Sequence, residues 1–271
     1  MRQQLKSRLI LILSLYVSFT SSVSALTINA AQPITEIVTV QPIIVSDDSG
    51  NNTATFFGNA SQQSIIEGLI DQIWAQAGID VNFLTPNSWN NTFANWGTGG
   101  PPNNAGNTRP TSDLNTMLAN GSTAGVTHSD PSIINMFFVR IAAGFSLLSN
   151  NSAAGLARLG GNGVSQYVGS NLLNSAGGQE VVASVVAHEI GHNLGLAHTA
   201  GANLMTPGSS DEFLNSSQIA AALNSNLSVP VTAPVPVPAA FWLFGSAMLW
   251  LFRKQWFIAP TPTTSPKGLG I

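Results

Sequence analysis

The spacing of apolar residues along the chain predicts several helices. Between residues 61 and 77 the apolar positions recur every three or four residues, which predicts a helix with Ser61 as its N-cap and Gly78 as its stop. The same spacing predicts a helix from Glu180 onward, a closing helix from Asn215 onward with Ser216 or Ser217 as its cap, and a short helix over 112–119. The apolar face of the first helix consists of Ile65, Ile66, Leu69, Ile70, Ile73, Trp74 and Ala77.

Other stretches carry the β-branched and apolar runs that favour strands. We expect strands over 34–45 and 79–86, a buried strand beginning at Ile134, and strand character around 164–168. Residues 86–110 have Gly, Pro or Asn at nearly every other position, so we expect a long surface loop there. The polar run 46–52 is predicted to be a turn, because it lacks the spacing of a calcium loop.

The first 25 residues have the layout of a secretory signal peptide. Basic residues at Arg2, Lys6 and Arg8 precede an apolar run from Leu9 to Val17, and small residues lead to a cleavage site after Ala25. An uncleaved anchor is the alternative, although the run is short for a membrane span. We therefore expect an exported protein with residues 1–25 removed.

Composition narrows the classes of partner. Only 8% of the residues are charged and the net charge is −3, so the chain has no basic field to hold a nucleic acid, and we expect none as a partner. There are no cysteines, which excludes disulfides, thiolate ligands and a cysteine nucleophile. The exported domain must be held together by burial, and a metal ion would add to its stability.

The chain after residue 228 changes character. We expect one folded domain over 30–228, a proline-rich linker over 229–238, an apolar segment with a basic cluster over 239–254, and a tail over 255–271. The stretch "VPVPAAFWLFGSAMLWLFRK" resembles the VPxP variant of PEP-CTERM sorting signals. That resemblance implies delivery to a bacterial membrane and an exosortase-type sorting partner. The alternative is a plain membrane anchor, and the tail after the basic cluster departs from the known signals.

The stretch "AHEIGHNLGLAHTAGANLM", residues 187–205, contains three of the four histidines. On a helix His188 and His192 project from the same face and can share one metal ion, with Glu189 beside them. His198 cannot join them on a straight helix, because ten residues rise about 15 Å whereas a Zn–N bond is about 2.1 Å. A reversal is therefore needed, and Gly195 is placed to make it.

This arrangement predicts a zinc site of the catalytic kind. Three neutral imidazoles leave a fourth tetrahedral position open for water or substrate, so we expect Zn²⁺ held by His188, His192 and His198. The alternative for such a pattern is a solvated helix face that binds nothing, but the added glycine and third histidine make a chance match rare. His128, the remaining histidine, is expected to be hydrogen-bonded within its own loop.

The same residues resemble a known family. "HEIGHNLGLAH" matches the HExxHxxGxxH motif of the metzincin zinc peptidases, and "NLMTP" is similar to their Met-turn, in which Met205 would form an apolar floor beneath the metal. The resemblance implies an α+β, metzincin-like zincin fold with a mixed twisted sheet, an active-site helix, the Met-turn and a C-terminal helix. The chain departs from some members in having Pro207 where they have a tyrosine, and it has no latency cysteine.

The function implied by the resemblance is a secreted zinc-dependent metalloendopeptidase acting on proteins or peptides. Glu189 would be the general base for a zinc-activated water. Substrate would lie along an edge strand near 160–169, and residues 206–213 would wall a specificity pocket. Two alternatives stay open: a catalytically silent zinc-binding surface or matrix module, and a zinc hydrolase of an amide other than a protein.

Overall fold

The computed structural model describes residues 26, 28–96, 111–140, 154–208 and 211–231. Its described strands form a seven-stranded mixed sheet, with the order β2-β1-β4-β6-β5 and with β3 and β7 paired to β1. The strands are β1 (Glu36–Ser46), β2 (Ile79–Phe83), β3 (Asn87–Asn90), β4 (Ile134–Phe138), β5 (Gly155–Ala157), β6 (Gly163–Gln166) and β7 (Ser228–Pro230). This mixed sheet with its helices confirms the predicted α+β class.

The sheet is parallel along most of its width. β1 pairs in parallel with β2, β3 and β4, and β4 pairs in parallel with β6. Two short strands run the other way: β5 against β6, and β7 against the start of β1. β7 extends the sheet to Pro230, two residues beyond the predicted end of the domain at 228.

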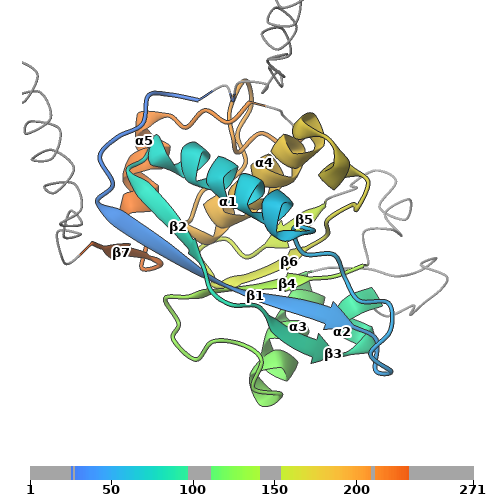
Figure 1. The fold of residues 1–271 in the computed structure, drawn as a ribbon. Helices are drawn as coiled ribbons and strands as arrows, with labels where there is room; N and C mark the ends of the chain where they lie inside the picture. The colour runs from blue at the N-terminus through green and yellow to red at the C-terminus, as the bar shows by residue number, and fades with distance from the viewer. Residues whose placement is uncertain (1–25, 27, 97–110, 141–153, 209–210, 232–271) are drawn as a thin grey trace, which may run out of the picture. The chain divides into compact units, whose positions relative to one another are not determined.

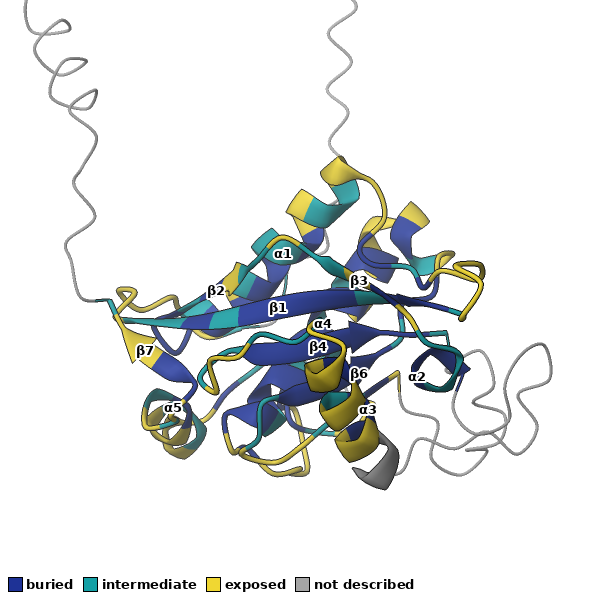
Figure 2. Cartoon of the chain, turned by 90° about the horizontal axis from the view of Figure 1, so that it is seen from below, coloured by how far each residue is buried: buried dark blue, intermediate teal, exposed yellow. Residues whose placement is uncertain are grey.

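Helices cover both faces of the sheet. α1 (Ala60–Ala75) and α4 (Ala176–Asn193) lie on one face, and α2 (Thr92–Trp96) and α3 (Thr111–Thr123) lie on the other (Figure 1). Side chains of β1 alternate between the two faces of the sheet. Val38 and Val40 pack toward α1 and α4, whereas Ile43 and Val45 pack with α2 and α3. Buried residues accordingly run along β1 and β4 in the middle of the fold (Figure 2).

Two predicted helix caps are wrong. The N-cap of α1 is Asn59 rather than Ser61, and the N-cap of α5 (Ser216–Leu223) is Asn215 rather than Ser216 or Ser217. In each case the asparagine oxygen accepts an N–H from the glutamine three residues on, and that glutamine's side chain accepts the N–H of the asparagine. An Asn-x-x-Gln pair satisfies two helix-end donors at once, which a lone serine does not.

The predicted loop over 86–110 is also partly wrong. Its first part forms β3 and α2, and Trp89 and Trp96 are buried there. The Asn-rich sequence suits this arrangement because the Asn91 side chain accepts the N–H of Ala94 at 2.7 Å and so begins α2. Residues 97–110 lie outside the described residues, and α3 extends beyond the predicted 112–119.

The remaining predicted segments fall outside the described residues. These are the signal peptide over 1–25, the apolar segment over 239–254 and the tail over 255–271, which stay predictions. None of the described helices combines the length and the apolar character needed to cross a membrane.

Candidate metal centre and active site

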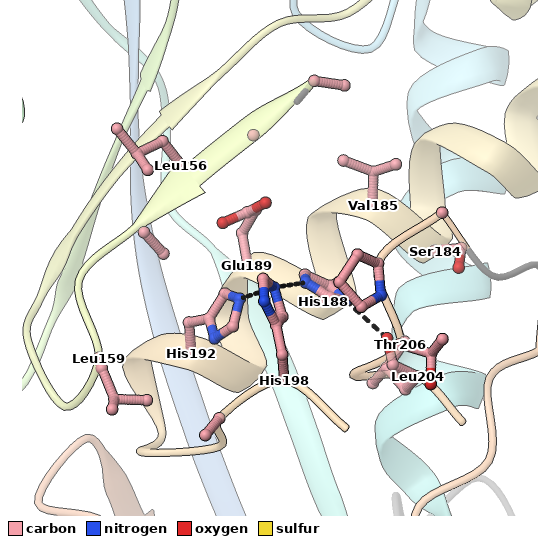
Figure 3. A pocket seen from close by; sticks show the side chains of 16 residues that line it. Leu156, Leu159, Ser184, Val185, His188, Glu189, His192, His198, Leu204 and Thr206 are labelled. Atoms are coloured by element: carbon pink, nitrogen blue, oxygen red, sulfur yellow. Dashed lines mark hydrogen bonds between the residues drawn. The ribbon is translucent and has the colours of Figure 1, made fainter. Parts of the chain in front are cut away.

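Helix α4 carries the first two histidines. It begins at Ala176, four residues before the predicted start, because the Ser175 hydroxyl accepts the N–H of Gly178 at 3.1 Å and caps it. Val186 and Ile190 are fully buried and fix its inner face against the core. His188 and His192 follow one another by one turn, so their rings project side by side into the hollow shown in Figure 3.

The chain reverses at Gly195. Its φ is +92°, the left-handed region that favours glycine. The Gly195 N–H donates to the carbonyl of His192 at 3.0 Å, and the Leu196 N–H donates to the carbonyl of Gly191 at 2.9 Å. These two bonds are the Schellman pattern that closes a helix. The reversal carries His198 back toward the helix, as the ligand spacing requires.

The ring nitrogens of the three histidines converge. His198 Nε2 lies 3.2 Å from His188 Nε2 and 3.0 Å from His192 Nε2. Nitrogens bound to one tetrahedral zinc ion at about 2.0–2.1 Å stand roughly 3.3–3.4 Å apart. The three imidazoles therefore fit a single ion, and they are the group of potential metal ligands found among the described residues.

The opposite nitrogen of two rings is held by backbone. His188 Nδ1 lies 2.6 Å from the carbonyl oxygen of Leu204, and His192 Nδ1 lies 2.7 Å from that of Leu196. A carbonyl oxygen only accepts, so each Nδ1 must carry the proton and each Nε2 must present a lone pair to the centre. Sequence reasoning missed these partners because any residue type supplies a carbonyl.

Electrostatics keep these rings neutral. Burial lowers the pKa of His192 to about 4, and the hydrogen bond to Leu196 only partly opposes this. Burial also lowers the pKa of His188 from its ordinary value. Neutral imidazole is the form that binds a metal ion, so His188 and His192 are ready to bind one at neutral pH.

Met205 lies against the same helix. It is fully buried, and a Cβ added at Gly191 would meet its sulfur. Its N–H donates to the side chain of Asn203 at 2.9 Å, and Asn203 exchanges two side-chain hydrogen bonds with Gln218 of α5. The predicted Met-turn segment is thus tied to the closing helix and pressed against the turn of α4 between the two histidines.

Glu189 shares a hollow with the histidines. The hollow has a volume of about 580 Å³ and is lined mainly by apolar groups of β5, α4 and residues 204–208. Glu189 is 6% exposed and lies beside the rings of His188 and His192 (Figure 3). Thr206, Pro207 and Gly208 form part of the wall of this hollow. That residues 206–213 wall a specificity pocket stays a prediction.

The predicted edge strand is misplaced. We expected it near 160–169, but β6 lies between β4 and β5, and 160–161 belong to the turn between β5 and β6. Among the described strands the edge beside the hollow is β5, which sequence reasoning missed because a strand of three residues gives no measurable alternation. His128 lies elsewhere: its Nδ1 accepts the N–H of Asp130 at 3.1 Å within its own loop.

Comparison with known proteins agrees with this geometry. The family model of reprolysin-like metallopeptidases of family M12B matches residues 104–199, which include all three histidines and Glu189. No curated protein matches the sequence.

Several solved structures show a distant similarity. Archaemetzincin from Archaeoglobus fulgidus, complexed with malonate, is 15% identical, with 68% of this chain and 99% of that chain covered and a TM-score of 0.38. Archaemetzincin from Methanopyrus kandleri is 15% identical, with 69% and 88% covered and a TM-score of 0.36. Metalloproteinase-II from Bacteroides fragilis is 13% identical, with 72% and 57% covered and a TM-score of 0.42.

The three-histidine site and the reprolysin-like match together define the class of this chain. It is a zinc metallopeptidase, and hence a hydrolase.

Proposed function

We propose that the chain is an exported zinc-dependent metalloendopeptidase that hydrolyses internal peptide bonds. One observation carries the proposal: the Nε2 atoms of His188 and His192 lie 3.2 and 3.0 Å from His198 Nε2, at the wall of a hollow that also contains Glu189. A structural zinc site is usually closed by a fourth protein ligand, and the described residues offer only three here.

Zinc is the ion that suits this donor set best. Imidazole also suits copper and nickel, but three neutral imidazoles with an open fourth position are typical of catalytic zinc. His188, His192 and His198 would hold the ion. When bound, zinc supplies Lewis-acid chemistry: it polarises the scissile carbonyl and lowers the pKa of water toward neutrality.

The protein's own groups move the proton and hold the geometry. Glu189 accepts a proton as the water oxygen attacks the carbonyl carbon, and it delivers that proton to the leaving nitrogen as the C–N bond breaks. The carbonyls of Leu204 and Leu196 keep the rings of His188 and His192 in one tautomer and one orientation. Glu189 thus lies beside histidine ligands whose orientation is fixed.

The shape of the hollow favours an endopeptidase. Its lining extends to both sides of the histidines, with Leu159 on one side and Ser184 and Thr206 on the other (Figure 3). A polypeptide can therefore continue in both directions from the scissile bond, with its backbone beside β5. Apart from Glu189 and the histidines the lining is uncharged, so we expect apolar or neutral side chains next to the scissile bond.

Export and membrane delivery belong to the same proposal and rest on sequence. The layout of residues 1–25 supports cleavage after Ala25. The likeness of residues 235–254 to a PEP-CTERM signal supports at least transient anchoring in a bacterial membrane, with exosortase-type machinery as a partner. Sequencing the N-terminus of the exported protein would test the first part: Leu26 should come first, and a retained Met1 would contradict cleavage.

The enzymatic part is tested on the full-length chain in detergent. We expect about one zinc per chain by elemental analysis, and cleavage of casein and of internally quenched peptides. His198→Ala should lose most of the zinc and all cleavage. Full zinc occupancy with no cleavage across broad peptide libraries would favour the silent binding module instead. Zinc retention unchanged by His198→Ala would contradict the site itself.

A further inference from the structure

We propose that Gly155 is a positioning residue for Glu189, because β5 passes so close to that carboxylate that only glycine fits. The inference builds on the proposed role of Glu189 as general base. Gly155 is the first residue of β5 and is buried. A Cβ built at this position would overlap three side-chain atoms of Glu189, namely Cγ, Cδ and Oε1.

The requirement for glycine here is steric and not conformational. Gly155 is not among the glycines with a positive φ, so its backbone suits any residue. The alternation of β5 explains the contact: Ala157 packs with the main core beside α4, whereas Leu156 packs against the cluster on the opposite face. Gly155 shares the face of Ala157, so its missing side chain would point at α4.

Hydrogen bonds hold the start of β5 in place beside Glu189. The carbonyl of Ala154 accepts the N–H of Tyr167 at 2.8 Å and the side-chain amide of Gln166 at 3.2 Å. Gln166 is itself 1% exposed and donates a second hydrogen bond, to the carbonyl of Tyr167, at 2.8 Å. A buried amide with two backbone partners therefore pins the strand directly before Gly155.

The other end of the hairpin is tied to α4 itself. The Asn193 amide donates to the carbonyls of Arg158 and Gly163, each at 3.2 Å, and the N–H of Gly160 donates to the carbonyl of His192 at 2.9 Å. The strand that contacts Glu189 is thus fixed to the helix that carries Glu189. Any added atom at Gly155 must push the carboxylate rather than the strand.

A methyl group at Gly155 should therefore displace Glu189 and leave the histidines in place. A general base acts at about 2.6–3.2 Å from the proton it takes, and a misplacement of about 1 Å costs on the order of 100-fold in rate. We expect Gly155→Ala to lower kcat by about 10- to 100-fold, with KM and zinc content within about twofold of the wild type.

A double-mutant cycle in thermal stability tests the contact without relying on activity. In the otherwise wild-type full-length chain, Gly155→Ala should lower Tm by about 2–10 °C, as overpacking of a buried site does in a domain of this size. In a Glu189→Ala background the same change should leave Tm within about 1 °C or raise it, because the methyl group then fills vacated space. Gly68→Ala and Gly177→Ala are matched controls, since nothing lies within 4 Å of a Cβ at either position.

The outcomes separate this inference from the proposed function. Equal Tm losses in both backgrounds, or a kcat for Gly155→Ala within twofold of the controls, would overturn the positioning role. If the wild type itself shows no cleavage, the proposed function fails, while the stability cycle still decides whether Gly155 seats Glu189. If Gly155→Ala alone does not fold, recovery of folding in the Glu189→Ala background supports the contact, and failure in both overturns it.

Discussion

The Nδ1 atom of His192 lies 2.7 Å from the carbonyl oxygen of Leu196, on the far side of the reversal at Gly195. The same turn that returns His198 to the helix therefore also orients a ligand that precedes it. Two of the three histidines depend on the backbone path through one glycine, although that glycine contacts no metal ion.

Gly195→Val should weaken metal binding. With φ at +92° a β-branched residue is strained by about 1–2 kcal/mol or more, and relaxing that strain moves both Leu196 and His198. We expect at least a tenfold loss in zinc affinity, measured by competition with a chelator. Gly125→Val is the matched control, because Gly125 has a φ of +70° and open space but lies far along the chain from the site. Equal affinities for the two variants would contradict the role of Gly195.

Gly191→Ala should disturb the floor of the site. Its methyl group would meet the sulfur of the fully buried Met205, so the variant should lose about 1–3 kcal/mol of unfolding free energy and bind zinc more weakly. Gly177→Ala in the same helix has open space and should be neutral or slightly stabilising. Denaturant unfolding checks both, and equal stabilities would show that Met205 moves aside freely.

Removing the side-chain amide of Asn193 should destabilise the fold, and replacing it with a carboxylate should destabilise the fold more. Its Nδ2 donates to three backbone carbonyls, those of Arg158, Gly161 and Gly163, and the residue is fully buried. Asn193→Ala should cost about 1–3 kcal/mol of unfolding free energy, and Asn193→Asp more, because a buried charge would then face carbonyl oxygens. Asn120→Asp, at an exposed position of α3, is the control. An Asn193→Asp variant more stable than Asn193→Ala would contradict this prediction.

Asp71 should make stability depend on pH. Burial raises its pKa to about 6 from 3.8, against the opposing effect of the Val81 N–H that donates to it. Because the folded state holds this proton more tightly, the contribution of Asp71 to stability is greatest below pH 4 and is lost as pH rises through 6.

Asp71→Asn removes that titration and keeps an oxygen for the Val81 N–H. Relative to the wild type, the variant should gain about 1 kcal/mol of unfolding free energy between pH 4 and pH 7.5, after allowance for solvent screening of a half-buried group. Denaturant unfolding of both proteins at the two pH values measures this. A difference that does not change with pH would show that the Asp71 pKa is not raised.

The features of the site that depend on side-chain type and spacing could be predicted from the sequence. The offset of His198 from His192 required a reversal, and Gly195 was the residue able to make it. The carbonyls that fix the histidine tautomers were out of reach, because Leu196 and Leu204 carry no sign of that role in their side chains. Gly155 was equally hidden, since its close approach to Glu189 arises only when β5 is paired to β6.

Local hydrogen-bond competition accounts for the other misses. Asn59 and Asn215 each lie within two residues of a serine of similar capping ability. The asparagine is the cap in both helices because Gln62 and Gln218, three residues further on, complete the capping box. The positions of β5 and β6 in the sheet depend on the pairing of β6 with β4, which comes well before it in the sequence. The amino-acid composition of these short strands does not determine that pairing.

The role of Glu189 as general base is tested by comparing metal content and turnover in the Glu189→Gln variant and the wild-type protein. Glutamine keeps the size of the side chain but cannot accept the proton of water, so the variant should retain about one zinc per chain. Its kcat on an internally quenched peptide should fall by about 10²- to 10⁴-fold. A zinc-loaded Glu189→Gln variant that cleaves at the wild-type rate would contradict the role of Glu189 as general base.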